Sequence, residues 1–599
     1  MHIRMKSLFA LNKYLYKYRF LLSFGMIFVI TSNIFALFLP QLIRIGIEQI
    51  QVYLPFSYIF KGLEINTFFY DWVMYLILII SILIVATALF RGLLMFLMRQ
   101  TLVVMSRHIE FDLKNEIYGH YQVLTPSFYK RYATGDLMSR ISEDVSRVRM
   151  YVGPAIMYIS GLVITFTLVI YSMIRINPYL SFWTLLPLPF LSYSIFKVSK
   201  TINLKSEIIQ KTLSKLTSRA QESYSGIRVI KSYARDQQIQ EEFEDLAIQY
   251  KEESLSLAKV EAFFRPLMLF LVGMSTLTAI YMGGIEVSKG TFTAGNIAEF
   301  VVYINMLTWP VASLGWAVSL IQRAAASQKR INEFLDVEPD IVSGDKYDIK
   351  EGINTIQFDQ VTFTYPDTGI VALKNVSFEI KKGEKVAIVG KTGSGKSSII
   401  ELIMRAYEPE SGKIKVNGHV FKDVQLDQFR AEIGYVPQEV FLFSDSIKNN
   451  IKFANPEIDN ETVEEYAKTA VVYDDIMSFP KKFDTIIGER GVMLSGGQKQ
   501  RISIARALIK DPSVIILDDC LSAVDNQTQN SILANFQEKW RDKTVVFITH
   551  RLFSVKNFDK ILVLDNGELV GAGKHDDLYK NNPYYYELYQ LQLNEEVNS

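Results

Sequence analysis

The stretch KVAIVGKTGSGKSS, residues 385–398, decides the fold of the C-terminal half of this chain. An apolar strand pattern runs directly into a glycine-rich segment that ends in a lysine and a serine. Gly390, Gly395, Lys396 and Ser397 satisfy the spacing G-x-x-x-x-G-K-[ST], in which backbone N–H groups of the loop surround phosphate oxygens. The sequence therefore predicts an α/β domain that binds a nucleoside triphosphate.

The predicted phosphate loop contributes a continuous set of binding residues. We expect Lys396 to reach the β- and γ-phosphates of ATP and the Ser397 hydroxyl to bind Mg²⁺. A helix that begins near Lys396 would also direct its positive end at the phosphates. The predicted ATP-binding residues of this loop are Gly390, Lys391, Thr392, Gly393, Ser394, Gly395, Lys396, Ser397 and Ser398.

A second acidic signal lies downstream in SVIILDD, residues 513–519. Its apolar run predicts a buried strand that ends at Asp518, the expected Mg²⁺ ligand. Asp519 follows, at the position from which a carboxylate would activate water. An apolar run that ends in acid is weak evidence alone, but a phosphate loop upstream makes it good evidence.

A third motif is LSGGQKQRISIARAL, residues 494–508, in which two glycines precede an amphipathic helix pattern. The bland interpretation is a helix start capped by Ser495. Between a phosphate loop and a carboxylate strand, LSGGQ resembles the signature of ATP-binding cassette (ABC) proteins. The resemblance implies that Ser495, Gly496, Gly497 and Gln498 contact ATP.

Further motifs match the same family. Tyr365 in FTYPDTG is similar to the aromatic residue that stacks on adenine. Gln438 in YVPQEVFLF is similar to the glutamine that senses the metal and γ-phosphate, and His550 in VFITH to the switch histidine. GERG, 488–491, and SAVD, 522–525, fall where the family has its cross-domain loop and D-loop. The resemblance implies Asp519, His550 and Gln438 as catalytic residues, and Ser397, Gln438 and Asp518 as Mg²⁺ ligands.

The N-terminal half has a different character. Six stretches of 19 to 24 residues contain no charged side chain, and each is long enough to cross about 30 Å of hydrocarbon as a helix. Six such stretches in 321 residues predict a membrane domain. The predicted helices lie near 20–43, 72–97, 151–174, 176–199, 264–287 and 297–321.

Basic residues predict the orientation of these helices. Segments 1–19, 91–150 and 197–265 contain 5, 9 and 12 Lys and Arg residues, whereas the segments between them contain one or two each. Since basic segments stay inside, we expect both termini in the cytoplasm and a multi-pass protein of the cytoplasmic membrane. The two long inner segments have helical apolar spacing and predict stalks that extend below the bilayer.

Six spans, long inner arms and one C-terminal cassette together resemble a bacterial ABC exporter half-transporter. Segments 128–145 and 222–236 are similar to the two intracellular coupling regions of that family. The expected fold is an all-α six-helix transmembrane domain with long cytoplasmic helices, followed by an α/β P-loop nucleotide-binding domain. The expected boundaries are 1–322 for the membrane domain, 323–350 for a linker and 351–599 for the cassette.

The resemblance also implies a second chain and a function. Two cassettes would enclose two ATP molecules, each between the phosphate loop of one chain and the LSGGQ of the other. ATP binding and hydrolysis, with Mg²⁺, would then drive export. The even balance of 64 basic and 63 acidic residues indicates no nucleic-acid partner.

Asp519 departs from the family, which usually has glutamate at this position. Aspartate is one methylene shorter, which withdraws the carboxylate by about 1 Å, and a misplacement of ~1 Å can cost ~10² in rate. A short acid beside an intact LSGGQ resembles the weakly hydrolysing subunit of heterodimeric multidrug exporters. A slow homodimer, in which a backbone shift lets aspartate act as the base, remains the alternative.

The charge-free stretches predict a lipophilic or amphipathic substrate, because none of them offers a charge to an ionic compound. Pro310 is expected to kink the sixth span. An importer built on the exporter fold and a nucleotide-gated channel are the alternatives. Candidate cavity residues, each of which could equally face lipid, are Phe24, Phe28, Phe35, Tyr303, Asn305, Thr308 and Trp309.

Overall fold

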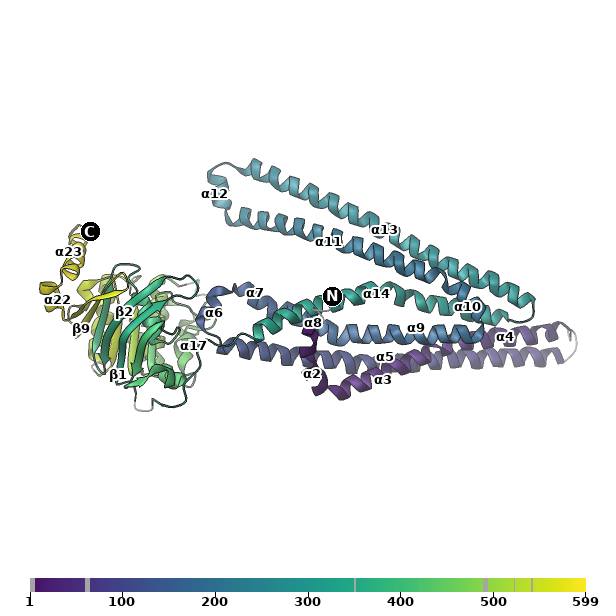
Figure 1. The fold of residues 1–599 in the computed structure, drawn as a ribbon, viewed down its shortest axis with the longest axis horizontal. Coiled ribbons are helices and arrows are strands. Elements are labelled where there is room, and N and C mark those ends of the chain that lie inside the picture. Colours follow the sequence, from purple (N-terminus) through teal and green to yellow (C-terminus); the bar gives the residue numbers. More distant parts are fainter. Residues whose placement is uncertain are drawn as a thin grey trace. The chain divides into compact units, whose positions relative to one another are not determined.

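The structure is a computed structural model that describes residues 6–59, 65–349, 352–488, 494–521, 523–539 and 542–598. The chain forms two compact units, which we treat separately (Figure 1). Unit 1 comprises Met1–Tyr121 and Gly135–Val337, and unit 2 comprises Gln122–Thr134 and Glu338–Ser599. The division after Val337 falls within the predicted linker.

The described residues of unit 1 are helical, as expected where lipid leaves backbone groups no partner outside their own segment. Six candidate membrane spans occur among these described residues: Arg19–Tyr53, Tyr70–Val123, Thr134–Ile176, Pro178–Ser225, Asp236–Ser288 and Ala294–Leu335. The main helices are α2 (Asn12–Lys17), α3 (Arg19–Ala36), α4 (Phe38–Ile59), α5 (Ile65–Val123), α7 (Thr134–Ser139), α8 (Val145–Met150), α9 (Ile156–Ile176), α10 (Pro178–Leu185), α11 (Pro187–Ser225), α12 (Ile227–Ser232), α13 (Asp236–Ser288) and α14 (Ala294–Leu335). The predicted six-helix membrane domain is confirmed.

Several of these helices are much longer than a membrane is thick. Helix α5 has 59 residues, or roughly 90 Å at 1.5 Å per residue. Helices α11 and α13 pack along each other and are joined through α12. The predicted helical stalks are therefore continuous with the spans. Helix α14 continues through Pro310, whose ring removes one backbone donor from the helix.

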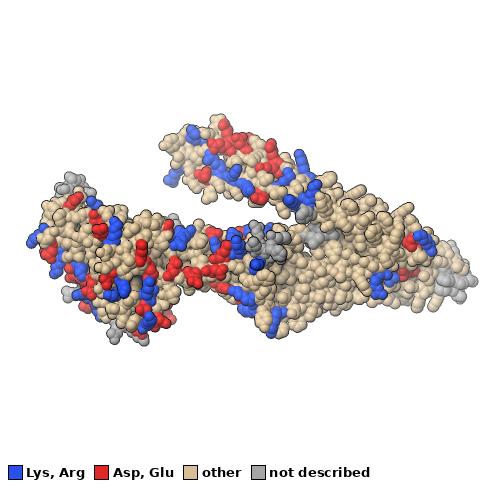
Figure 2. All heavy atoms as spheres, in the orientation of Figure 1, with Lys and Arg blue, Asp and Glu red and all other residues tan. Residues whose placement is uncertain are grey.

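Charged side chains on unit 1 gather toward the ends of its helices. The face in Figure 2 shows a wide uncharged surface between them. One ion pair joins two helices of unit 1: Arg44 Nε of α4 lies 3.0 Å from Glu299 Oε2 of α14. The Tyr303 hydroxyl donates to the other oxygen of Glu299 at 2.9 Å. Glu299 directly precedes the charge-free stretch that begins at Phe300, and it is only 2% exposed.

Unit 2 contains two sheets. The smaller has the order β2-β1-β4-β5 and is antiparallel. The larger has the order β10-β9-β3-β8-β7-β6 and is parallel except for β10. The strands are β1 (Thr355–Thr364), β2 (Val371–Lys381), β3 (Lys385–Gly390), β4 (Ser411–Val416), β5 (His419–Val420), β6 (Ile433–Val436), β7 (Val514–Asp518), β8 (Thr544–Ile548), β9 (Lys560–Asp565) and β10 (Glu568–Gly573).

Both faces of the larger sheet are covered, which explains the continuous apolar runs in its strands. Successive side chains of a strand point to opposite faces. Ala387 and Val389 of β3 therefore lie in one hydrophobic core, while Val386 and Ile388 lie in the other. The α-helices of unit 2 are α6 (Pro126–Arg131), α15 (Lys396–Ile403), α16 (Leu426–Ala431), α17 (Ile447–Ile451), α18 (Asn460–Thr469), α19 (Tyr473–Ser478), α20 (Gly496–Leu508), α21 (Asn526–Lys539), α22 (His575–Asn581) and α23 (Pro583–Asn598).

Helix α6 belongs to unit 2 although its sequence lies among the membrane helices. Ser127 at its start donates to Asp340 Oδ2 at 2.8 Å. Lys130 Nζ lies 3.3 Å from Glu401 Oε1 and 5.2 Å from the ring centre of Tyr365. The first predicted coupling region thus begins on the surface of the cassette.

Candidate functional site

The predicted catalytic residues meet at one edge of the larger sheet. Strands β3, β8, β7 and β6 are parallel neighbours, so their carboxyl ends share that edge. The phosphate loop follows β3, and Asp518 ends β7. His550 lies two residues after β8, and Gln438 two residues after β6. The sheet therefore brings together residues that are up to 160 positions apart in sequence.

The phosphate loop requires its glycines. Gly395 has φ +99°, and a Cβ at this position would lie 2.5 Å from the Ala372 carbonyl oxygen. At Gly390, φ is +152° and a Cβ would lie 2.2 Å from the Leu564 carbonyl oxygen. The Ser394 hydroxyl is buried and has no hydrogen-bond partner among the described residues. A tight loop with an unpartnered buried hydroxyl, placed before α15, fits a phosphate ligand.

Lys396 is held across this loop. Its Nζ donates to the carbonyl oxygens of Gly390 at 2.9 Å and Lys391 at 2.8 Å. Burial lowers the pKa of Lys396, while the nearby Asp519 and Asp518 oppose that shift. The ammonium is thus fixed beside the loop that would cradle phosphate, where a charged donor is most effective.

Asp518 and Ser397 form the predicted metal-binding pair. The Ser397 hydroxyl donates to Asp518 Oδ1 at 3.4 Å. Burial, and then the charge of Asp519, raise the pKa of Asp518 to about 6 against the lowering effect of Ser397. These hard oxygen ligands fit Mg²⁺, which commonly uses one or two protein carboxylates and completes its shell with phosphate and water. Among the described residues, no group of three His, Cys, Asp or Glu offers a complete protein cage.

Asp519 occupies an unusual backbone position. Its φ is +45°, a left-handed conformation that aspartate adopts more readily than bulky residues. Its N–H donates to the Ile548 carbonyl oxygen at 3.0 Å, which ties the end of β7 to the end of β8. Burial raises the pKa of Asp519, and His550, Lys396 and Arg551 oppose this shift. The carboxylate is therefore part of the same electrostatic cluster as the phosphate-loop lysine.

His550 and Gln438 both have exposed side chains at this edge. Desolvation and the charge of Lys396 lower the pKa of His550, which favours the neutral imidazole. Its backbone carbonyl accepts a hydrogen bond from Gln592 Nε2 of the last helix, α23. Gln592 lies in no recognisable motif, so its place beside His550 could not be predicted from the sequence.

The LSGGQ residues form a helix start. Ser495 Oγ accepts from the Gln498 N–H at 3.2 Å, and Gln498 Oε1 accepts from the Ser495 N–H at 3.0 Å, as in a capping box. A Cβ at Gly497 would lie 2.9 Å from the Ala523 carbonyl oxygen. Among the described residues, no hydrogen bond or ion pair joins this motif to the phosphate loop. The capping interpretation is correct for this chain, and it leaves the exposed side of Ser495 and Gly496 open.

Tyr365 lies beside the helix that follows the phosphate loop. Its hydroxyl bonds Ser398 Oγ at 2.9 Å and donates to Glu401 Oε2 at 2.7 Å. The structure therefore brings the predicted adenine-stacking residue to α15, and Glu401 emerges as an unpredicted partner. The predicted cross-domain loop, GERG, and the predicted D-loop, SAVD, are only partly described. The residues outside the described part are Glu489, Arg490, Gly491 and Ser522.

The candidate cavity residues of the membrane domain separate into different environments. Tyr303 is fully buried, whereas Phe24 and Trp309 are more than half exposed. Asn305 and Thr308 donate to carbonyls one turn earlier in their own helix. Trp309 lines a pocket of ≈ 400 Å³ in unit 1. Arg91 and Arg99 also line it. Both lie in the predicted inner segment 91–150, and Arg91 also lies in the predicted second helix, 72–97.

Two family models match the chain. Residues 13–311 match the ABC transporter transmembrane region, and residues 373–522 match the ABC transporter family. The matches cover the two predicted halves in the predicted order, with one nucleotide-binding region after one membrane region.

Relatives are similar over most of their length. The chain is 36% identical to the probable multidrug resistance ABC transporter ATP-binding/permease protein YheI of Bacillus subtilis, covering 81% of this chain and 83% of that protein. It is 34% identical to the multidrug resistance-like ATP-binding protein MdlA of Escherichia coli, with 84% and 85% covered. It is 31% identical to the ATP-dependent lipid A-core flippase of Syntrophus aciditrophicus, with 89% and 88% covered.

The fold matches a solved structure described as a bacterial Atm1-family ABC exporter with ATP bound. The TM-score is 0.77 over 96% of this chain and 99% of the other, at 24% identity. At that identity the likeness concerns the fold, and it confirms the predicted architecture of six apolar helices followed by an α/β nucleotide-binding domain.

Proposed function

The chain belongs to the ABC transporter family as a membrane region fused to one nucleotide-binding domain, and from this we propose that it is half of a dimeric exporter. The family couples ATP hydrolysis to transport, so the chain is an ATPase of a multi-pass membrane transporter. We assign lipophilic or amphipathic compounds as its cargo, in keeping with the multidrug and lipid A-core names of its relatives.

One observation carries the proposal: the phosphate-loop lysine, a Ser397–Asp518 pair and Asp519 share one sheet edge in a chain with six apolar spans. Lys396 would bind the phosphates, while Ser397, Asp518 and Gln438 would hold Mg²⁺. Bound Mg²⁺ would neutralise charge on the phosphates. We assign residues 1–322 to the membrane domain, 323–350 to the linker and 351–599 to the cassette.

The second chain of the dimer would complete each ATP site. Ser495 and Gln498 satisfy each other as a helix cap and make no hydrogen bond to the phosphate loop of their own chain. The exposed side of this motif supports a role over the ATP of a partner. Each ATP would then join two chains, and its differential binding to the closed state would drive the conformational change.

We propose that this chain contributes the phosphate loop of the weaker ATP site in a heterodimer. The hydrogen bond from the Asp519 N–H to Ile548 fixes the backbone at 3.0 Å, which opposes the shift needed to advance a short carboxylate. A positioned base contributes about 10²–10⁴-fold in rate, so withdrawing it leaves a slow site. A slow homodimer would instead use two Asp519 sites.

A vesicle experiment tests the direction of transport. Inside-out membrane vesicles that contain the chain and its partner should accumulate a fluorescent lipophile only when Mg-ATP is supplied. An importer would deplete preloaded vesicles of the same compound, and a channel would pass current without concentrating it. Failure of ATP to drive any accumulation in inside-out vesicles would refute the export proposal.

We also propose that both termini lie in the cytoplasm. The basic bias of segments 1–19, 91–150 and 197–265 supports this orientation, as does the need of the cassette for cytoplasmic ATP. Accessibility of an N-terminal epitope in inside-out vesicles, but not in intact cells, is the expected result.

A further inference from the structure

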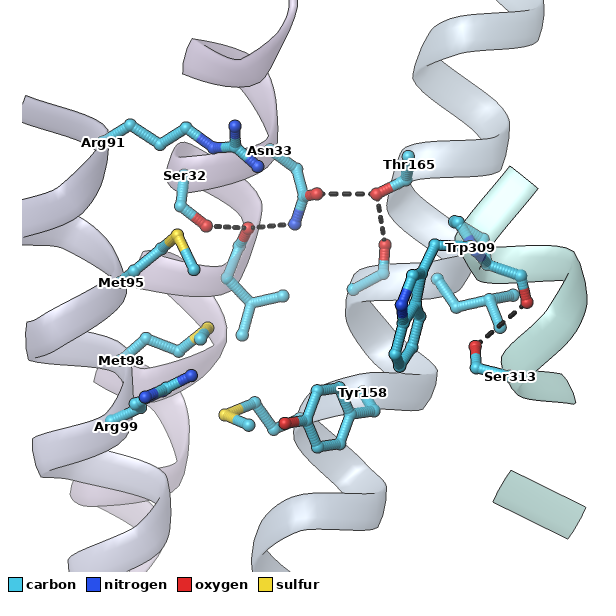
Figure 3. Close-up of a pocket in the computed structure, with 15 residues that line it drawn as sticks. Ser32, Asn33, Arg91, Met95, Met98, Arg99, Tyr158, Thr165, Trp309 and Ser313 are labelled. Atoms are coloured by element: carbon cyan, nitrogen blue, oxygen red, sulfur yellow. Dashed lines mark hydrogen bonds between the residues drawn. The ribbon is translucent and has the colours of Figure 1, made fainter. Parts of the chain in front are cut away.

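A pocket of ≈ 400 Å³ in unit 1 lies among helices α3, α5, α9 and α14 (Figure 3). Its volume is in the range of sites for drug-sized compounds. The residues around it combine aromatic rings, thioethers, amides, hydroxyls and two guanidinium groups, with no carboxylate. They are Val29, Ser32, Asn33, Arg91, Met95, Met98, Arg99, Met157, Tyr158, Gly161, Leu162, Thr165, Trp309, Pro310 and Ser313.

Two contacts fix the level of the arginines along the membrane helices. A Cβ at Gly25 of α3 would lie 2.5 Å from Leu102 of α5, and one at Gly46 of α4 would lie 3.7 Å from Ile80 of α5. Residues 25–46 of α3 and α4 therefore run antiparallel to residues 80–102 of α5. The two contacts are 21 residues apart on the first segment and 22 apart on the second. Arg91 and Arg99 fall between the two contacts.

This register places both arginines beside apolar neighbours. Arg99 lies about 4–5 Å and Arg91 about 16 Å beyond Leu102 along α5, toward the Gly46 contact. In the facing segment, residues 25–46, the positions level with Arg99 and Arg91 fall within the charge-free stretch 20–43. The Thr165 hydroxyl of α9, which donates to Asn33 Oδ1 at 2.6 Å, lines the same pocket.

The six stretches contain no charge, as expected, but two arginines that follow the second stretch line this pocket. The charge-free stretch of the second span ends at Phe90, but α5 continues as one helix through Arg91 and Arg99. Charge-free residues delimit each span separately, whereas the relative levels of the spans depend on packing between helices. Charged groups at this level are costly and are commonly functional.

Neither guanidinium is neutralised by a carboxylate among the described residues, and Nε of Arg91 is buried without a hydrogen-bond partner. The contrast with Arg44 is informative, because that arginine lies in the facing segment and pairs with Glu299 at 3.0 Å. Arg44 is thus matched by a carboxylate, whereas the pocket has two arginines that form no ion pair with a described residue. Arg91 is half-buried and Arg99 is exposed, and a partly buried guanidinium without a carboxylate partner favours an anion supplied from outside the protein.

The apolar part of the pocket lies between the two arginines. Met95 and Met98 follow Arg91 along α5, and Trp309 and Tyr158 lie across the pocket from them (Figure 3). Methionine adapts to irregular apolar ligands, and the aromatic rings add flat apolar surface. A ligand that fills this space would present its apolar portion to these four side chains and its charge to a guanidinium.

We propose that this pocket binds amphipathic anions, with the anionic group held by Arg91 and the apolar portion held among Met95, Met98 and Trp309. Arg99, which is exposed nearer the polar continuation of α5, attracts the anion as it enters. This inference rests on the proposed export function, since it names the class of compound that the membrane domain accepts. Arginine suits the role because its fork of N–H donors matches a carboxylate, sulfonate or phosphate.

The test uses three probes that share one dansylaminoundecyl chain and end in a sulfonate, an alcohol or a trimethylammonium group. Binding is measured by fluorescence titration of the whole protein in lipid nanodiscs, with empty nanodiscs subtracted. The wild type should bind the sulfonate at least about tenfold more tightly than the alcohol, because a charge-assisted hydrogen bond is worth roughly that factor or more. The trimethylammonium probe should bind most weakly.

Variants assign the preference to the pocket. Arg91→Gln should weaken sulfonate binding about tenfold and leave alcohol binding unchanged, whereas Arg91→Lys should keep part of the preference. Arg107→Gln is the matched control, because Arg107 lies on the same helix but pairs with Glu110 at 3.0 Å outside the pocket. Equal binding of sulfonate and alcohol by the wild type would overturn the proposal. Equal losses for both probes in Arg91→Gln would also overturn it.

Uptake of the same probes separates this inference from the export proposal. ATP-driven accumulation of the sulfonate in inside-out vesicles supports both. Accumulation of the alcohol without a sulfonate preference would leave export standing and refute the anion site. A sulfonate preference in binding that Arg91→Gln removes, with no ATP-driven uptake of any probe, would leave the anion site standing and refute export.

Discussion

Gln592, in the last described helix, α23, bonds the backbone of His550 and of Leu552, two residues further along the chain. Its Nε2 donates to the His550 carbonyl oxygen, and its Oε1 accepts from the Leu552 N–H at 2.8 Å. A single amide therefore satisfies an acceptor and a donor of the loop that follows β8. The C-terminal helix thereby takes part in placing a residue of the predicted ATP site.

Removing this amide should impair hydrolysis at the site of this chain. In an Asp519→Glu background, where that site is expected to hydrolyse, Gln592→Ala should lower the added ATPase activity about tenfold. A displaced loop misplaces His550, and a shift of ~1 Å can cost ~10² in rate. Gln590→Ala is the control, because Gln590 lies on the same helix but donates to Tyr579. Equal activity of both variants in a steady-state assay would contradict a positioning role.

Lys396→Ala should weaken ATP binding at this site by at least about tenfold, because a charged hydrogen bond is worth about 1.5–3 kcal/mol. The measurement is a titration with a fluorescent ATP analogue. Lys374→Ala, which changes an exposed lysine of β2, should leave affinity unchanged. The phosphate-loop assignment fails if the two variants bind the analogue equally.

The heterodimer predicts that the carboxylate strand and the LSGGQ motif of this chain serve different ATP molecules. Asp519→Asn should leave most of the ATPase activity, since the partner supplies the base of the faster site. Ser495→Asp should abolish it, because a negative charge would face the phosphates bound by the partner. Aspartate retains the helix cap that serine provides, so the fold of α20 should survive.

Purified transporter, assayed for ATPase beside Ser495→Thr as a matched control, decides between the two assemblies. Equal and near-complete loss in Asp519→Asn and Ser495→Asp would show that both sites depend on Asp519, as in a homodimer. Asp519→Glu should raise turnover in either assembly, because it restores the missing methylene.

Asp518 should destabilise the protein when metal and nucleotide are absent. Its folded pKa of about 6 lies above the ordinary value of 3.8, so the stability associated with its protonation is lost as pH rises toward and through 6. With EDTA at pH 7.5, Asp518→Asn should therefore raise the midpoint of thermal unfolding. The gain corresponds to no more than about 3 kcal/mol, at 1.36 kcal/mol per pKa unit.

The difference between wild type and Asp518→Asn should shrink as pH falls from 7 toward 4, when measured by calorimetry. Asp525→Asn is the control, since hydrogen bonds from Thr528 lower rather than raise the pKa of Asp525. In Mg-ATP the order should reverse, because only the wild type gains from the metal. A midpoint that does not rise in EDTA would refute the destabilising role of Asp518.

Local spacing sufficed to predict the phosphate loop and the six spans. The loop is specified by closely spaced glycines, and Gly395 could not carry a Cβ without meeting Ala372. Asp518 was recognisable because a fully buried strand leads directly to it. In these cases the signal and the structural requirement lie within a few residues of each other.

Other features depend on contacts distant in sequence and had no local signal. The level of Arg91 follows from packing of Gly25 against Leu102, and the role of Gln592 follows from a helix that meets β8 only in the folded chain. Glu401 became visible as a partner of Tyr365 only once α15 was placed beside that tyrosine. Such relations are set by tertiary packing, which periodicity does not encode.

The membership of Gln122–Thr134 in unit 2 imposes an order on biosynthesis. The ribosome completes this segment more than 200 residues before it begins the cassette. Until Asp340 and Glu401 have been translated, Ser127 and Lys130 lack the partners that they bond in the finished protein. The segment Gln122–Thr134 therefore stays without these partners while the rest of the membrane half is synthesised. A ribosome that stalls near residue 338 would expose this segment to chaperones and proteases.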